Sequence, residues 1–251
     1  MLLHPGESYA NTAKTIDVIN SDVKKMEDQI EDVPVDQYDP WTTKKVIQWK
    51  TDKISTDPDQ QLNDYKDGWI SAYRNVIKKA AEVYDIPTEL LACVAWIEVA
   101  GDPMWIDPVA YAARKFLPDS FWNRTLSVNS EFYDKYYRYP SKTSFGDISM
   151  QLGVAANTLG IGPENLDLFS EMKLASVLSD PKMSIMFAAR HLAQLKNIDF
   201  PDIPSHELTL DEMKVIANRY NMGSSLSLET IAQYDYGSRF WERMDDFKNL
   251  W

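Results

Sequence analysis

The residue best suited to acid–base chemistry in this chain is a glutamate at the end of an apolar run. Glu98 follows eight consecutive apolar residues, 90–97, and precedes a Val-Ala-Gly-Asp-Pro break. A helix this apolar must be buried on most sides, so a carboxyl group at its end lies against apolar walls. Partial desolvation raises the pKa of such a group, which can then hold and deliver a proton near neutral pH. The alternative is a Glu98 that turns outward where the helix meets solvent.

Helical patterns must position this acid, because they dominate the chain on both sides of it. Apolar residues recur at three- and four-residue spacing, which predicts helices over about 10–31, 41–54, 61–84, 89–98, 181–195, 210–220 and 238–249. Strand alternation is scarce, with room for one short hairpin within 125–147. The predicted fold class is therefore mainly α.

Capping residues mark where three of these helices begin. Thr88 is expected as the N-cap of the helix that leads to Glu98. Asp180 precedes a proline at a first helical position, and Thr209 with Glu212 forms a capping-box sequence.

Two regions differ in composition. Residues 1–60 are polar and acidic, and are expected to form an N-terminal helical extension, with residues 61–251 as the catalytic domain. Trp41 and Trp49 in the extension suggest a helical cover packed on that domain or a docking surface for a partner.

Charge and residue counts narrow the classes of function. The formal net charge of −12 argues against nucleic-acid binding, which needs surplus cations. Cys93 is the single cysteine and lies inside the apolar run, which favours a core thiol over a nucleophile. The three histidines lack metal-ligand spacing, and no phosphate loop is present, so we expect neither a metal nor another cofactor.

Three segments stand in an informative order: AWIEVAGDP at 95–103, TSFGDISMQLGVAANTLG at 143–160 and IANRYNMG at 216–223. Over roughly residues 80–235 this order resembles the lysozyme-like superfamily of goose-type lysozymes and soluble lytic transglycosylases. The resemblance implies a lysozyme-like helical fold with Glu98 as the catalytic acid. It also implies that Met150-Gln151 lies in the substrate cleft and that Tyr220-Asn221, with Gly223, flanks the acid.

The chain departs from the family pattern at two places. Val99 stands where a serine usually follows the glutamate, and Ile148-Ser149 replaces a Gly-Leu pair before Met150. The first change removes a hydroxyl expected to contact substrate, and the second alters the floor of the cleft, where we expect Ser149 among the substrate-binding residues.

A second carboxylate is needed only for some routes of glycoside cleavage. Asp147 is the first candidate to activate water, ahead of Asp102 and Asp107, although it could instead cap a helix starting near Ile148. The resemblance also permits a route in which a hydroxyl of the sugar attacks and Glu98 acts first as acid and then as base.

Residues 114–142 are rich in aromatic and basic side chains. Aromatic rings pack on the C–H faces of sugars and cations meet the carboxylates of peptide stems, so we expect this segment, including Tyr137, to contact substrate. The alternative is a satellite hydrophobic cluster beneath a long loop.

Together these features predict a peptidoglycan-cleaving muramidase or lytic transglycosylase that cuts between N-acetylmuramic acid and N-acetylglucosamine. The start of the sequence lacks a secretory signal and no run is long enough to span a bilayer, so we expect synthesis in the cytoplasm and no stable membrane insertion. The expected site of action is the periplasm or wall of a target bacterium. That predicts a toxin effector with an immunity protein and a secretion-machine component as partners, or else a phage lysin. The competing class is a non-catalytic glycan- or protein-binding module on the same scaffold.

Overall fold

The structure, a computed structural model, describes residues 5–51, 58–99, 106–117 and 139–242. It is mainly helical, as predicted. Its α-helices and strands are α1 Pro5–Ile30, α2 Thr43–Thr51, α3 Pro58–Tyr84, α4 Thr88–Glu98, α5 Ile106–Phe116, β1 Ser144–Phe145, β2 Met150–Gln151, α8 Leu152–Thr158, α9 Leu168–Leu178, α10 Pro181–Asp199, α11 Leu210–Met222, α12 Leu228–Ile231 and α13 Ser238–Glu242.

Two of the three predicted helix starts are confirmed. The Asp180 carboxylate accepts from the N–H groups of Lys182 and Met183 at the start of α10. Thr209 and Glu212 form the capping box of α11. The prediction for Thr88 is wrong. The carbonyl of Pro87 already accepts the N–H groups of residues 90 and 91, so Pro87 is the N-cap and Thr88 is the first helical residue.

The hairpin lies at the end of the predicted range and beyond it. Strands β1 and β2 are antiparallel, with Ser144 opposite Gln151 and Phe145 opposite Met150. The turn between them comprises residues 146–149. Residues 125–138 of the predicted range lie outside the described residues.

Helix α4 is the centre of the fold. Every residue from Leu90 to Trp96 is buried, because α4 packs against α3, α10 and α11. An apolar helix enclosed in this way explains the uninterrupted run in the sequence. Cys93 belongs to this core, as predicted, and burial raises the pKa of its thiol.

Helix α1 belongs to the same core. Its side chains Ile19, Val23, Met26 and Ile30 are almost completely buried against α9, α10 and α3. The ammonium group of Lys182 donates to the carbonyls of residues 30, 31 and 33 at distances of 3.2, 3.1 and 2.7 Å. Residues 1–60, expected as an extension, therefore include a helix that completes the main core.

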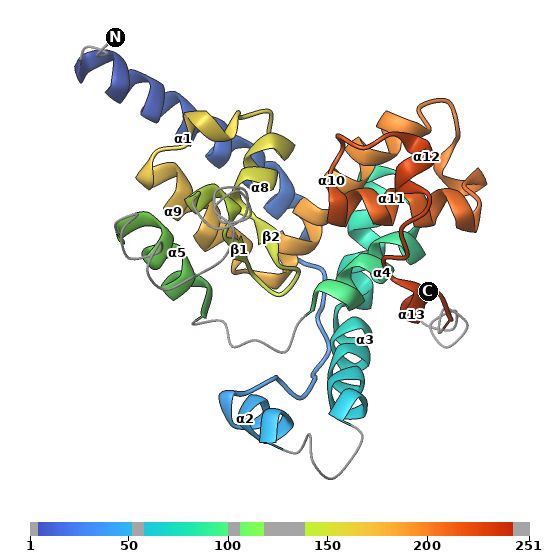
Figure 1. Cartoon of the computed structure of the whole chain (residues 1–251). Coiled ribbons are helices and arrows are strands. Elements are labelled where there is room, and N and C mark those ends of the chain that lie inside the picture. The colour runs from blue at the N-terminus through green and yellow to red at the C-terminus, as the bar shows by residue number, and fades with distance from the viewer. Residues whose placement is uncertain (1–4, 52–57, 100–105, 118–138, 243–251) are drawn as a thin grey trace.

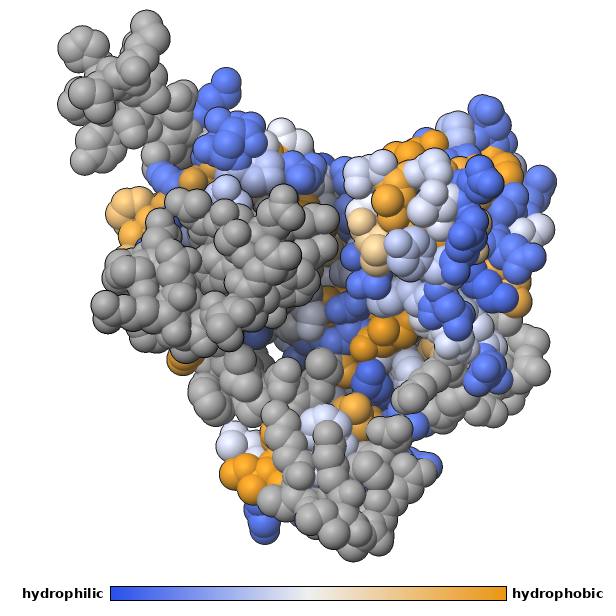
Figure 2. Space-filling view, viewed as in Figure 1, coloured by the Kyte–Doolittle hydropathy of each residue, from blue (hydrophilic) through white to orange (hydrophobic). Residues whose placement is uncertain are grey.

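The helices form two groups with a hollow between them (Figures 1 and 2). One group holds α1, α5, α8, α9 and the hairpin, and the other holds α4, α11, α12 and α13. Helix α10 contacts α8 and α9 in the first group and α4 and α11 in the second. Helix α2 packs on the N-terminal half of α3, away from both groups.

Within the described ranges, no helix combines the length and apolar character that crossing a bilayer requires.

Candidate active site

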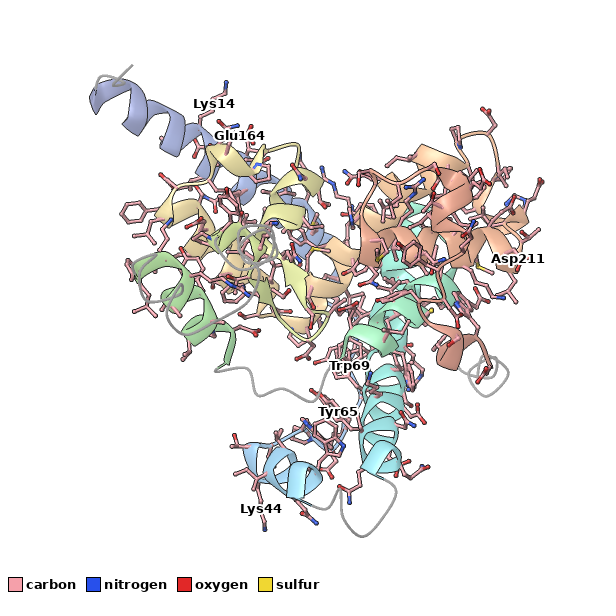
Figure 3. All side chains as sticks on the ribbon, viewed as in Figure 1. Lys14, Lys44, Tyr65, Trp69, Glu164 and Asp211 are labelled. Carbon is pink, nitrogen blue, oxygen red and sulfur yellow. The ribbon has the colours of Figure 1, made fainter. Side chains whose placement is uncertain are left out.

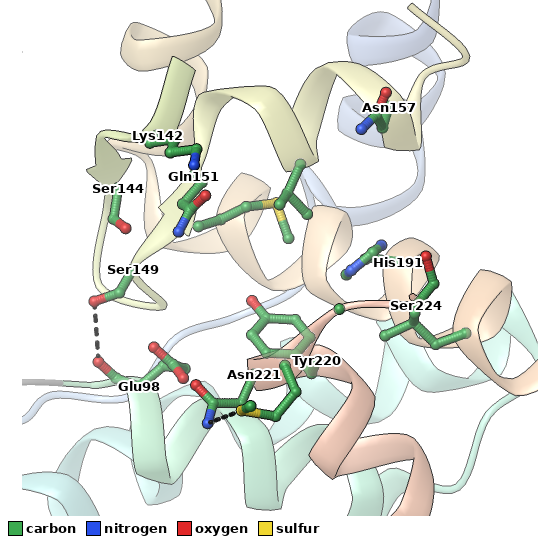
Figure 4. A pocket seen from close by; sticks show the side chains of 15 residues that line it. Glu98, Lys142, Ser144, Ser149, Gln151, Asn157, His191, Tyr220, Asn221 and Ser224 are labelled. Carbon is green, nitrogen blue, oxygen red and sulfur yellow. Dashed lines mark hydrogen bonds between the residues drawn. The ribbon is translucent and has the colours of Figure 1, made fainter. Parts of the chain in front are cut away.

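A cleft of about 460 Å³ lies between the two groups of helices, and Glu98 is in its wall. All three segments singled out in the sequence contribute to it: the end of α4, the hairpin with α8, and the end of α11 (Figure 4). Its lining consists of Glu98, Lys142, Ser144, Ser149, Met150, Gln151, Val154, Asn157, His191, Leu195, Tyr220, Asn221, Met222, Gly223 and Ser224.

Glu98 is half-buried at the C-terminal end of α4. Burial raises the pKa of its carboxyl group above the ordinary value of 4.5. Two neighbours act in the opposite direction, because the Tyr236 hydroxyl donates a hydrogen bond to Oε1 and Lys66 supplies a nearby positive charge. The net shift is upward, so the protonated form persists to higher pH than in an exposed glutamate.

Tyr236 is placed by a buried amide in α11. The Nδ2 group of Asn218 donates to the carbonyls of Ile231 and Tyr234, at 2.9 and 2.7 Å, and its Oδ1 accepts the backbone N–H of Tyr236 at 3.0 Å. These three hydrogen bonds fix the segment that follows α12. Asn218 is therefore a positioning residue for the partner of Glu98.

Gly237 lets that segment approach α4. Its φ is +90°, and a Cβ atom there would lie 2.7 Å from Cδ1 of Ile97 and 3.1 Å from Sγ of Cys93. Only glycine fits a left-handed conformation at such close range. The close approach brings Tyr236 to Glu98.

Lys66 reaches the same end of α4 from helix α3. Its Nζ donates to the carbonyl of Ile97 at 3.0 Å and lies 4.8 Å from the centroid of the Trp96 ring. A cation at this position satisfies an end carbonyl and complements the negative end of the helix dipole. The same charge favours the ionised form of Glu98.

The end of α11 is fixed by a buried ion pair. The Arg219 guanidinium donates to both carboxylate oxygens of Asp199 at 2.7 and 2.8 Å, and to the carbonyl of Leu226 at 2.6 Å. A bidentate pair of this kind fixes the relative orientation of the two side chains and also strengthens the interaction. The helix then ends at Gly223, whose φ is +82°, so the Tyr-Asn-x-Gly segment forms a defined helix end beside the cleft.

The hairpin turn contacts Glu98 directly. Gly146, with φ +77°, packs so closely on the end of α9 that a Cβ would lie 1.9 Å from the Leu178 carbonyl oxygen. At the other end of the turn, Ser149 has φ +47°, a backbone conformation that residues other than glycine and asparagine seldom adopt. Its hydroxyl donates to the Glu98 carbonyl at 3.3 Å (Figure 4).

The structure shows where the residues lie that differ from the lysozyme-like pattern. Val99 is 1% exposed and belongs to the core, so its side chain is not part of the cleft lining. Ser149 places a hydroxyl at the C-terminal end of α4, where it donates to the carbonyl of Glu98.

The other residues predicted for the cleft differ in their exposure. Met150 is buried in the floor, whereas Gln151 and Asn221 are exposed at its edge. The Tyr220 hydroxyl is buried without a hydrogen-bond partner among the described residues, and burial together with the charge of Glu98 raises its pKa.

His191, one of the three histidines that lack metal-ligand spacing, also lines the cleft. Its ring centroid is 5.6 Å from that of Tyr220, and burial lowers its pKa to about 4, so it is neutral near neutral pH. Its Nδ1 has no hydrogen-bond partner within the described part of the chain.

Asp147 is not part of the cleft lining. Its Oδ2 accepts the indole N–H of Trp69 at 2.8 Å, and burial raises its pKa. It does not cap a helix either, since α8 begins at Leu152 with Gln151 as its N-cap. Asp107 lies in the first turn of α5 and does not line the cleft. Asp102 and Tyr137 lie outside the described residues.

No group of three or more histidine, cysteine, aspartate or glutamate side chains is placed to hold a metal ion in the described part of the chain.

Sequence reasoning did not identify Tyr236, Asn218 or Lys66 as parts of the site. The glycine after Tyr236 is the one local signal of a close approach in that segment. Asn218 and Lys66 carry no comparable signal, because their roles depend on partners that are distant in sequence.

Comparison with known proteins finds no family model that matches the chain, and no matching curated protein or solved structure. The chemistry of the cleft must therefore be inferred from its own residues and their geometry.

Proposed function

We propose that this protein cleaves the glycan strands of peptidoglycan between N-acetylmuramic acid and N-acetylglucosamine, with Glu98 as the proton donor on a lysozyme-like fold. One observation carries the proposal. Glu98 is the only carboxylate among the described residues that line the cleft, and its pKa is raised by burial while a tyrosine hydroxyl holds its Oε1.

Breaking a glycosidic bond requires protonation of a poor leaving oxygen while positive charge develops on the sugar. A carboxylic acid performs this step best when its pKa is near the working pH. Burial moves Glu98 in that direction, and Tyr236 and Lys66 limit the shift so that the group can still ionise. The three influences together suit a group that must give up a proton and then take one back.

The absence of a second carboxylate in the described lining favours a route that uses the substrate's own hydroxyl. Glu98 donates its proton to the glycosidic oxygen as the C–O bond breaks. A hydroxyl of the same sugar then forms a new bond to the anomeric carbon, and its proton returns to Glu98. The product carries an anhydro end and is lighter by one water than the product of hydrolysis.

The remaining lining suits a sugar chain. The amides of Gln151, Asn157 and Asn221 offer both donors and acceptors, as hydroxyl and acetamido groups require. Val154 and Met222 provide apolar surface for the C–H faces of sugar rings.

The arrangement of the three segments supports the lysozyme-like assignment. Residues 95–99, 144–151 and 216–223 are far apart in sequence but meet at one cleft. Because peptidoglycan lies outside the cytoplasmic membrane, the proposed substrate also requires delivery to the periplasm or wall. An antibacterial effector with a cognate immunity protein fits that requirement.

Incubation of purified peptidoglycan with the wild type and with Glu98→Gln, followed by mass analysis of the soluble fragments, tests the proposal. We expect release by the wild type and a loss of at least about a hundredfold in Glu98→Gln, since general acid catalysis contributes that much or more. Fragments with anhydro ends support the route with one carboxylate, whereas hydrated ends select hydrolysis.

Asp147→Asn is the matched control, because it changes a half-buried carboxylate outside the cleft. It should retain release, since its amide oxygen can still accept from Trp69. Absence of release by the wild type between about pH 5 and pH 8 would overturn the enzymatic function. Equal release by wild type and Glu98→Gln would overturn only the role of Glu98.

A further inference from the structure

A second pocket, of about 570 Å³, lies between α2, α3 and the segment that joins α1 to α2. It shares no residue with the cleft around Glu98. Its volume lies within the range of about 300–1,000 Å³ typical of small-molecule sites. In Figure 3, Tyr65 lies where α3 faces α2, and Trp69 lies one turn further along α3.

Aromatic rings make one side of this pocket. Trp41 stacks on Tyr65 with ring centroids 5.0 Å apart and an angle of 29° between the planes. Tyr38 is tilted against Tyr65 at 6.5 Å. All three rings line the pocket and are partly exposed. Partly exposed aromatic rings held rigidly by one another provide flat apolar surface at little cost in side-chain entropy.

Polar groups make the rest of the lining, and one of them is the Asp64 carboxylate, whose Oδ1 accepts from Nε2 of Gln60 at 2.7 Å. Gln37, Gln48 and Gln61 contribute amides, each with a donor and an acceptor. The charges of Asp39 and Lys45 are paired with each other. With the Asp64 carboxylate in its lining, the pocket suits a ligand without negative charge that both donates and accepts hydrogen bonds and has a flat apolar face.

Gly68 opens the floor of the pocket. It lies in the interior of α3, on the face that also carries Gln61, Tyr65 and Ser71. A Cβ atom at Gly68 would meet nothing within 4 Å, so packing inside the protein does not require a glycine there. Glycine inside a helix is unfavourable, and one established use for it is close approach of the backbone to a ligand.

We propose that this pocket is a second carbohydrate-binding site, which takes an N-acetylated sugar ring between Trp41 and the backbone at Gly68. The flat C–H face of the ring packs on the aromatic side chains, and the acetamido group pairs with a glutamine amide. The choice of an N-acetylated sugar rests on the proposed function. The site itself rests on the pocket, and would tether the protein to the polymer that the cleft acts on.

Calorimetric titration with chitotetraose, a tetramer of β-1,4-linked N-acetylglucosamine, tests the site in a Glu98→Gln background, where no cleavage is expected. Gly68→Leu fills the floor of the pocket. Lys78→Leu is the matched control, because it places the same side chain at an exposed position of the same helix. We expect Gly68→Leu to bind one equivalent fewer than Lys78→Leu, and Trp41→Ala to weaken that same site by about tenfold or more.

Equal stoichiometry and affinity in Gly68→Leu and Lys78→Leu would overturn the proposal. Trp41→Ala gives an independent reading if Gly68→Leu does not fold, and unchanged binding by Trp41→Ala would overturn it as well. Failure of the proposed function is distinguishable. The wild type could release no peptidoglycan fragments while Gly68→Leu, in the Glu98→Gln background, still binds one equivalent less of chitotetraose. That result would overturn the proposed enzymatic function and support the second binding site.

Discussion

The Glu98 carboxyl group is subject to opposing influences from three sides. Burial at the end of α4 raises its pKa, whereas the hydroxyl of Tyr236 and the charge of Lys66 lower it. The hydroxyl and the charge come from different segments of the chain, so each of these two can be removed by its own substitution. The pH dependence of the proposed activity is therefore the most direct measure of this balance.

Tyr236→Phe removes the hydrogen bond that favours ionised Glu98. The pKa of Glu98 should rise further, so the alkaline limb of kcat/KM against pH should move to higher pH. The rate at its optimum should fall about ten- to a hundredfold, because the acid loses the group that orients it. Peptidoglycan release measured across the pH range gives both quantities.

Tyr234→Phe is the control for this substitution. Tyr234 is exposed, and only its backbone carbonyl takes part in the contacts of Asn218. Its profile should match the wild type. A profile of Tyr236→Phe that is also unchanged in both position and height would contradict the role assigned to Tyr236.

Glu98→Gln should increase stability at neutral pH. A carboxyl group with a raised folded-state pKa stabilises the fold below its ordinary value of 4.5, and that contribution is lost as pH rises through the folded-state pKa. Glutamine does not titrate. The Tm of Glu98→Gln should therefore exceed that of the wild type at pH 7.

The gain should disappear at about pH 4, where the wild-type group is protonated in both states. Thermal unfolding at both pH values measures it. Glu82→Gln changes the net charge equally at an exposed site on α3 and should show no such pH-dependent gain. A gain of equal size at both pH values would contradict the buried carboxylate as its source.

The sequence predicted Glu98 because the apolar run that desolvates it is local. It could not predict the residues that tune it. Tyr236 is 138 residues away, and Lys66 contacts a carbonyl 31 residues away. Asp147 illustrates the same limit for a residue that the sequence did suggest. Its carboxylate accepts a hydrogen bond from the indole of Trp69, which is 78 residues away in the chain, and the sequence gives no sign of that contact.

The starts of helices could be predicted from the sequence where the capping residue and the N–H groups it bonds lie within one turn of each other. Asp180 and Thr209 bond to N–H groups two or three residues away, so their roles are visible in the sequence. The start of α4 was misplaced by one residue because Pro87 and Thr88 are both compatible with a helix start, and only the backbone hydrogen bonds distinguish them.

Two glycine-to-alanine substitutions should have opposite effects on the elements that contain them. Gly68→Ala places a methyl group in open space inside α3 and should raise the free energy of unfolding by about 0.5–1 kcal/mol. Gly237→Ala forces a side chain onto φ +90° and against Ile97, and should lower it by about 1–3 kcal/mol.

Urea unfolding of both variants measures the difference, and each serves as the control for the other. Gly237→Ala should also reduce peptidoglycan release, since it displaces the segment that carries Tyr236. Equal effects of the two substitutions on stability would contradict the close packing of residues 236–237 on α4.

At the scale of the whole molecule, α1 is part of the core that supports the cleft. Its four buried side chains contribute about 1.5–3 kcal/mol each, or about 6–12 kcal/mol together. The complete free energy of unfolding of a protein is about 5–15 kcal/mol. A protein that begins at residue 34 should therefore not fold cooperatively, despite retaining every residue of the cleft.

Circular dichroism during heating, together with size-exclusion chromatography, checks this expectation. A protein that begins at residue 13 keeps Ile19, Val23, Met26 and Ile30, and should unfold cooperatively. If the version that begins at residue 34 unfolds with the same Tm, α1 is an accessory and the predicted boundary at residue 60 describes the catalytic unit.

The contact between Lys182 and the end of α1 has a consequence for synthesis on the ribosome. The three carbonyls that it satisfies lie 149 to 152 residues earlier in the chain, and the apolar face of α1 packs on α9 and α10. Helix α1 is thus made long before these partners, because closure of so long a loop must precede its packing on them. Until α9 and α10 emerge, the apolar face of α1 lacks these two partners and is a natural target for a chaperone.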